Sequence, residues 1–281
     1  MSLVPDPVIL DVSPSGVAVV LLNREHKRNA FDELVIAGLA EAFETLKGAD
    51  HVRIVFLKGA GAHFSAGADL DWMKRQGEHL PADNEADALA LARMLKALHD
   101  LPQLTVALVD GAAMGGGAGL IAAADYAVAT KGAQFRFSEV RLGLTPATIS
   151  PYVVEAIGAR NARAYFAGAL PFGAEEAQRI GLIHEIVDGE AGLESAMKRL
   201  AGLAVENAPG AVADAKALVS YIVDDVTRPR HMLAPQIAQG RLIDNDLLHE
   251  TARRIAARRA SEEGREGLAA FLEKRKPNWS G

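Results

Sequence analysis

Two glycine-rich segments carry the residues whose types and spacing are best suited to chemistry. They are residues 63–70 (HFSAGADL) and residues 111–120 (GAAMGGGAGL). Each follows a short apolar run and precedes a helical pattern, so each is predicted to join a strand to a helix. Glycine lets backbone N–H groups approach a ligand, and those at a helix start are unpaired and lie at the positive end of its dipole. Two such turns after neighbouring strands could aim two N–H groups at one oxygen, as in an oxyanion hole.

These two segments also admit other interpretations. Glycines also serve simply to permit tight strand–helix turns. Neither segment matches the phosphate loop G-x-x-x-x-G-K-[ST], and residues 115–119 do not align with the dinucleotide fingerprint. His63 and His184 are predicted to be satisfied polar residues rather than bases, because no partner motif surrounds them. No His/Asp/Glu spacing suggests a metal site.

The elements that must hold the two turns alternate between strand and helix patterns over the first half of the chain. Strand patterns lie at residues 17–22, 52–57, 104–109 and 126–129, with helical patterns at 33–47, 84–99 and 115–124. Beyond residue 150 the pattern is mostly helical, at 151–168, 174–180, 192–206, 209–225 and 246–274, with a short edge strand at 183–187. This order predicts an α/β core over residues 1–200, followed by a helical region over residues 201–281.

Composition excludes several classes of function. The 281 residues include no Cys, which rules out disulfides, cysteine zinc sites, thiolate iron–sulfur clusters and a cysteine nucleophile. A net charge of −6 argues against a general nucleic-acid binder. No apolar run is long enough for a membrane helix, and the first residues lack the pattern of a signal peptide, so a cytoplasmic protein without a membrane partner is expected.

Several further blocks accompany the two turns. Before them stands LNREHKRNAF (residues 22–31); after them come Asp125, FSEVRLGLTP (137–146), GLIHEIV (181–187) and GLAAFLEKR (267–275). Together and in this order, the blocks and the two turns resemble the enoyl-CoA hydratase/isomerase (crotonase) superfamily over nearly the whole chain. The resemblance implies a crotonase-like spiral of ββα units with a C-terminal helical trimerisation region, and an acyl-CoA thioester as the substrate.

The resemblance also implies roles for individual residues. The oxyanion of a thioester enolate would be bound by the N–H groups of Ala66 and Gly116. Hydratases of the family commonly use two glutamates as acid and base; the second corresponds to Glu139, and the first falls on Gly119, which has no carboxyl group. Glu139 would then both deliver the proton and orient water, or the reaction would be an allylic isomerisation with one proton shuttle. Without this context, Glu139 would be interpreted as a helix cap or as an ion-pair partner of Arg136 or Arg141.

Substrate and CoA binding is expected at a wider set of positions. Asp69 is also predicted to cap a helix that begins at Leu70, and Trp72 with Met73 is interpreted either as acyl-pocket lining or as ordinary helix packing. Phe271 and Lys274 would reach the adenine and phosphate end of CoA. The full set is Lys27, Arg28, Ala30, Ala66, Gly67, Ala68, Asp69, Leu70, Trp72, Gly116, Gly119, Phe271 and Lys274.

Within the superfamily, the blocks look most like the bacterial methylglutaconyl-CoA hydratases. This implies addition of water to a branched 2-enoyl-CoA with a free carboxylate, which Arg136, Arg141 or Lys74 would meet. The alternatives are an enoyl-CoA isomerase and a catalytically weak acyl-CoA-binding scaffold. By resemblance, the protein assembles as a homotrimer or a dimer of trimers and needs no cofactor, since coenzyme A is part of the substrate.

Overall fold

A six-stranded, mostly parallel sheet forms the centre of the first part of the chain. The computed structural model describes residues 6–76, 80–227 and 245–280, and the order of the strands in this sheet is β1-β2-β3-β4-β6-β9. β1 pairs antiparallel with β2, and the other neighbours are parallel. Their bounds are β1 Val8–Val12, β2 Val17–Leu22, β3 Ile54–Gly59, β4 Leu104–Val109, β6 Tyr126–Thr130 and β9 Glu185–Val187.

A second sheet contains three very short strands in the order β5-β7-β8. These strands were not predicted from the sequence, because two or three residues are too few for a period-two pattern to emerge. They matter for the site, since β5 precedes the glycine triplet and β7 precedes Glu139. Their bounds are β5 Ala112–Met114, β7 Gln134–Arg136 and β8 Phe172–Gly173.

The helices follow the predicted patterns with two differences. The stretch 246–274 is divided at Ser261, whose side chain accepts the Gly264 N–H and begins a new helix there. The helix over 151–168 contains a kink at Gly158. The helices are α1 Glu33–Lys47, α2 Leu70–Gln76, α3 Pro81–His99, α4 Gly116–Ala123, α5 Ser150–Gly168, α6 Ala174–Ile180, α7 Gly189–Glu206, α8 Pro209–Thr227, α9 Asn245–Ala260 and α10 Glu262–Glu273, with 3-10 turns η1 Glu25–Lys27 and η2 Glu139–Leu142.

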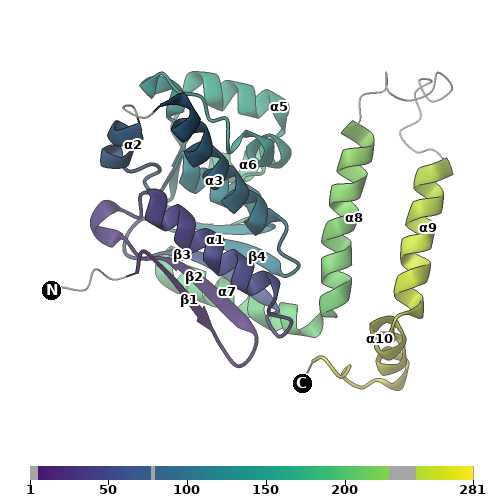
Figure 1. Cartoon of the computed structure of the whole chain (residues 1–281). Helices are drawn as coiled ribbons and strands as arrows, with labels where there is room; N and C mark the ends of the chain where they lie inside the picture. The colour runs from purple at the N-terminus through teal and green to yellow at the C-terminus, as the bar shows by residue number, and fades with distance from the viewer. Residues whose placement is uncertain (1–5, 77–79, 228–244, 281) are drawn as a thin grey trace. The chain divides into compact units, whose positions relative to one another are not determined.

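The middle strands of the central sheet, such as β3 and β4, are buried on both faces. Val55 and Leu57 of β3 point to one face and join a core with α1, α3, α4 and α5, whereas Ile54 and Phe56 point to the other face and pack with α7. This is the alternation expected of a strand, and it explains why β3 is apolar at almost every position. Figure 1 shows α1 and α3 lying along the sheet.

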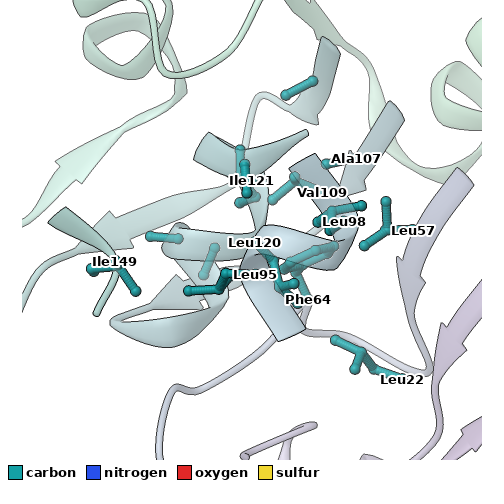
Figure 2. Close-up of a cluster of buried hydrophobic side chains, with 14 of the residues drawn as sticks. Leu22, Leu57, Phe64, Leu95, Leu98, Ala107, Val109, Leu120, Ile121 and Ile149 are labelled. Carbon is teal, nitrogen blue, oxygen red and sulfur yellow. The ribbon is translucent and has the colours of Figure 1, made fainter. Parts of the chain in front are cut away.

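The two glycine-rich segments rest on the larger core. Figure 2 shows Phe64 from the first segment and Leu120 from α4 gathered with Leu95 and Leu98 of α3. All four side chains are fully buried. The two turns therefore pack against close-packed apolar side chains, which allow the turns little displacement.

The last part of the chain forms a unit of its own. Contacts divide the chain into Met1–Ala204 and Val205–Gly281. Within the second unit, Arg258 of α9 pairs with Asp214 of α8 and with Glu263 of α10. No helix among the described residues has the length and apolar character needed to cross a membrane.

Candidate active site

The two glycine-rich segments lie side by side through backbone hydrogen bonds. The Ser65 N–H donates to Ala112 O, and the Met114 N–H donates to Ser65 O, both at 2.9 Å. Glycine is needed at this contact, because a Cβ on Gly117 would lie 2.7 Å from the Ser65 Cβ. A Cβ on Gly67 would lie 3.1 Å from Met114 O. The predicted pairing of the two turns is therefore present in the structure.

The Gly116 N–H is directed out of the start of α4. The preceding carbonyl, that of Gly115, accepts the Gly119 N–H at 3.0 Å and so points along the helix. No described peptide bond is cis, and in a trans peptide the N–H points opposite to the C=O. The Gly116 N–H has no acceptor in the part of the chain that the structure describes. It is available to a ligand at the positive end of the helix dipole.

The first turn requires a correction to the predicted donor. The Ala66 N–H donates to Arg28 O at 2.9 Å, so it is already occupied within the fold. The Ser65, Gly67 and Asp69 N–H groups are also used, by Ala112 O, Ser65 Oγ and Phe31 O. Ala68 alone between residues 65 and 69 has an N–H without an acceptor among the described residues. Ala68, not Ala66, is the position that can supply a free donor.

The Ala68 N–H also has a defined direction. The Gly67 carbonyl accepts the Phe31 N–H at 2.7 Å, so the trans peptide turns the Ala68 N–H away from Phe31. Gly67 has φ of 90°, a conformation that suits glycine. Both free N–H groups, those of Ala68 and Gly116, thus belong to turns that are hydrogen-bonded to each other.

Glu139 places a carboxyl group beside the second turn. Its Oε1 lies 3.1 Å from the point that a Cβ on Gly115 would occupy, and Gly115 itself has φ of 47°. Its Oε2 is buried and has no hydrogen-bond partner. Burial raises the pKa of the carboxyl above its usual value, opposed by a hydrogen bond from its own backbone N–H. The raised pKa favours the protonated form, and a carboxyl placed beside a pair of free N–H groups is suited to proton transfer.

The structural interpretation of Glu139, as an ion-pair partner of Arg136 or Arg141, is not supported. The Arg136 side chain instead donates from Nε to Ala169 O at 2.7 Å. Arg141 is exposed, and no ion pair joins it to Glu139 within the described residues. Lys74, the third cation considered for a substrate carboxylate, is exposed on α2.

Gly119, the position at which the resemblance to hydratases implies a glutamate, faces a filled space. A Cβ on Gly119 would lie 2.3 Å from the Ile149 Cγ2 and 2.9 Å from its Cβ. Ile149 is buried and lies at one side of the core cluster in Figure 2. An apolar side chain from the loop before α5 therefore occupies the space beside position 119, and no side chain fits there without a shift of Ile149.

A charged network ties the segment before α1 to the first turn. Arg24 donates to Ala30 O at 2.9 Å and pairs with Asp32 at 2.9 Å and Asp69 at 3.3 Å. Asp69 also accepts the N–H groups of Asp71 and Trp72, so it caps α2 as predicted. Burial alone would raise the pKa of Asp69, but these two N–H groups and the charges of Lys27 and Arg24 hold it below its usual value. The role of Arg24 was missed, since a lone arginine in a loop motif gives no sign of its partners.

The remaining predicted binding residues fall in three settings. Lys27 pairs with Asp71 at 2.7 Å, while Arg28 next to it is exposed and has φ of 51°. Ala30 and Trp72 are buried, and Trp72 belongs to the main core, whereas Leu70 is exposed. Phe271 and Lys274 lie exposed at the end of α10 in the second unit.

The polar residues predicted to be structural have that role. His63 Nδ1 accepts the Ala112 N–H, and His184 Nδ1 accepts the Ala127 N–H. Asp125 accepts both the N–H and the hydroxyl of Thr105 at 2.8 Å. In the described ranges, no group of three or more His, Cys, Asp or Glu side chains is placed to hold a metal ion.

The chain is similar to known proteins in sequence and in fold. The sequence profile of the enoyl-CoA hydratase/isomerase family matches residues 13–281. The chain belongs to this family. A putative enoyl-CoA hydratase from Thermus thermophilus is 32% identical over 271 residues, which are 96% of this chain and 100% of that protein.

The fold is that of the family as well. The crystal structure of an enoyl-CoA hydratase from Shewanella pealeana has a TM-score of 0.88 and 41% identity, and the match covers 97% of this chain and 96% of that one. Not all relatives are hydratases: an Escherichia coli 1,2-epoxyphenylacetyl-CoA isomerase is 29% identical over 97% of this chain and 98% of its own. Family membership therefore supports hydration or isomerisation of an enoyl-CoA.

The network around Asp69 yields a prediction on stability. Replacement Asp69→Asn keeps an oxygen for the α2 cap but removes the charge facing Arg24, and it is expected to lower the free energy of unfolding at pH 7 by about 1–3 kcal/mol. Asp71→Asn is the matched control, because Asp71 shares the partner Lys27 but its side chain is 74% exposed, against 5% for Asp69. The control is expected to lower the free energy of unfolding by less than about 1 kcal/mol.

The pH dependence of this difference follows from the lowered pKa of Asp69. A depressed folded-state pKa contributes stability that is complete above the unfolded-state value, about 3.9, and is lost as the pH falls through the folded-state value. Urea unfolding of wild type and Asp69→Asn between pH 7 and pH 3 should therefore show curves that converge at low pH. A constant difference over this range would contradict the assignment.

Proposed function

We propose that the protein is a hydratase that adds water reversibly to a branched 2-enoyl-CoA with a free carboxylate, of the 3-methylglutaconyl-CoA type. The observation that carries the proposal is the half-buried Glu139, whose Oε2 is buried without a hydrogen-bond partner and whose Oε1 lies beside the turn that presents the Gly116 N–H. Family membership supports an enoyl-CoA as the substrate. The sequence blocks that resemble the methylglutaconyl-CoA hydratases support a branched acyl group with a free carboxylate.

In this proposal, the substrate carbonyl accepts hydrogen bonds from the Ala68 and Gly116 N–H groups. Both are fixed by the fold before substrate arrives, so they stabilise the charge that develops on the oxygen with little reorganisation. Removal of one donor from such a site costs about 2.7–4 kcal/mol of barrier. The acyl-CoA would lie along the turn that contains Lys27, Arg28 and Ala30.

One carboxyl group can complete the proton balance. The Glu139 carboxylate takes a proton from water as the water oxygen bonds to C3, and the electron pair of the double bond moves onto the thioester as an enolate. The protonated Glu139 then delivers its proton to C2, and the carbonyl is restored. Glu139 ends in its starting state, and both new bonds form on the face of the substrate that it occupies. Ile149 against Gly119 supports this scheme, since it leaves no space for a second carboxyl there.

Replacement Glu139→Gln is expected to lower kcat at least about 100-fold on any accepted enoyl-CoA, with acyl-CoA affinity retained. The amide keeps the shape of the side chain but cannot shuttle the proton. Glu175→Gln, on the exposed start of α6, is the control and should turn over like wild type. Near-wild-type turnover by Glu139→Gln in a steady-state assay would remove Glu139 from the mechanism.

Glu139→Gln also has a predicted effect on stability. Measuring that effect shows whether a loss of kcat could instead result from misfolding. Because burial raises the folded-state pKa of Glu139, its ionisation opposes folding once the pH exceeds the unfolded-state value, about 4.3. Glu139→Gln should therefore be more stable than wild type at pH 8, and this gain should vanish below about pH 4. Equal stability at pH 8 would contradict the burial of an ionisable carboxyl.

The choice of substrate is tested by a panel of methylglutaconyl-, crotonyl- and 3-enoyl-CoAs. We expect the highest kcat/KM for methylglutaconyl-CoA, and we expect Arg141→Gln or Lys74→Gln to reduce that preference toward the crotonyl value. Double-bond migration in the 3-enoyl-CoA, at a higher kcat/KM than hydration, would favour the isomerase. Thermal stabilisation by every acyl-CoA without turnover would favour the scaffold.

We propose that the protein assembles as a homotrimer or a dimer of trimers, as the resemblance implies. A groove of about 930 Å³ lies between α8, α9 and α10 and is lined by apolar side chains such as Leu218, Ile255 and Leu268. Large exposed apolar surfaces of this kind are typical of interfaces. We expect sedimentation to give three or six times the 29.7 kDa of one chain, and Ile255→Asp to lower that mass. A wild-type mass of one chain at micromolar concentration would contradict this assembly.

A further inference from the structure

Phe31 contacts both turns that present the free N–H groups. Its own N–H donates to Gly67 O, and its carbonyl accepts the Asp69 N–H, both at 2.7 Å, so its backbone holds the two residues that flank Ala68. Its ring reaches the other turn: Cδ2 and Cε2 lie 3.1 Å from the point that a Cβ on Gly116 would occupy. Phe31 thus contacts the Ala68 turn through its backbone and the Gly116 turn through its ring.

We propose that Phe31 is a positioning residue that sets the spacing between the Ala68 and Gly116 N–H groups. The proposal rests on the function proposed above for these donors. Phe31 itself does not touch the reacting atoms in this scheme. Its backbone fixes where the Ala68 peptide lies, and its ring fixes how far the start of α4 can approach.

The position of Phe31 is itself determined from both sides. Before it, Ala30 O accepts from the Arg24 guanidinium, which is also paired with Asp69. After it, Asp32 accepts the N–H groups of Leu34 and Val35 and so begins α1. The Phe31 side chain is 2% exposed and belongs to the main core. Such a residue can act as a fixed spacer, because close packing leaves the ring little room to move.

The tolerance of an oxyanion site makes this spacing important. Donors must lie about 2.7–3.1 Å from the developing charge, and a displacement of 1 Å can cost about 100-fold in rate. Shortening Phe31 leaves a cavity directly under Gly116, into which the start of α4 can relax. The Gly116 N–H would then move relative to the Ala68 N–H, while the peptide hydrogen bonds of Phe31 would persist.

A purely structural role predicts a different outcome, and a matched variant separates the two. Phe56 is 0% exposed and lies on the opposite face of the sheet, packed with α7. Phe31→Leu and Phe56→Leu remove the same atoms from buried sites, so both are expected to lose stability. If Phe31 only fills the core, both variants should keep wild-type kcat at temperatures where they are folded.

We expect Phe31→Leu to lower kcat by about 10- to 100-fold with KM changed much less, and Phe56→Leu to leave kcat unchanged. Phe31→Met, which restores much of the volume, should recover part of the loss. Circular dichroism and thermal unfolding establish that each variant is folded at the assay temperature. If Phe31→Leu does not fold, Phe31→Met carries the test with the same expected direction and a smaller effect.

A spectroscopic measurement reports on the donors directly. Difference infrared spectra of a bound, saturated acyl-CoA should show the thioester C=O stretch at lower frequency than in solution, and Phe31→Leu should reduce this shift while Phe56→Leu retains it. A wild-type shift that Phe31→Leu leaves intact, together with wild-type kcat, overturns the role of Phe31 and leaves the proposed function standing. Absence of the shift in wild type overturns both, because the donors then do not bind the carbonyl.

Discussion

The close approach of two backbone turns is the constraint on which the rest of the site depends. Ser65 forms hydrogen bonds with both Ala112 and Met114. The first turn therefore pairs with β5, the edge strand that precedes the second turn. The contact leaves no room for a side chain at Gly117, and very little at Gly67. β3 and β4 are parallel neighbours, which brings the segments after their carboxyl ends to the same edge of the sheet. Glycine at these positions is thus required by packing as well as by conformation.

This arrangement leaves polar groups unpaired, and the surrounding structure compensates for them. Glu139 Oε2 and two N–H groups lack hydrogen-bond partners within the described chain, and each unpaired group costs free energy. Around them lie fully satisfied groups: Asn29 donates to Ala60 O and His63 O, and Arg24 joins Asp32 and Asp69. The satisfied network holds the turns in place, so the unpaired groups persist as a binding surface instead of closing on one another.

The sequence was sufficient to predict the two turns and their pairing, whereas the roles of Glu139 and Gly119 came from the resemblance and stay predictions. It did not reveal that the Ala66 N–H is occupied, because the acceptor, Arg28 O, lies 38 positions earlier and has no sequence signature. Nor did it reveal that Ile149 fills the space beside Gly119, since a buried apolar residue looks alike in any core. Strands of two or three residues, such as β5 and β8, were missed for lack of a readable period. The five-residue strand β1 was also missed, so prediction failed at one edge of the central sheet as well as at tertiary contacts.

Because Ile149 fills the space beside Gly119, Glu139 would have to perform the proton transfers alone. A single carboxyl that both accepts and returns a proton must stay free of strong ion pairs, because a facing cation would lower its pKa and fix its oxygens. Two arginines lie close to Glu139 in the sequence, and neither is paired with it in the described structure: Arg136 is turned to Ala169 O and Arg141 is exposed. Burial raises the pKa of Glu139 above the usual value of a glutamate, in the direction that favours the protonated carboxyl. The hydrogen bond from Arg136 to Ala169 O therefore matters for the site, because it keeps the guanidinium from pairing with Glu139.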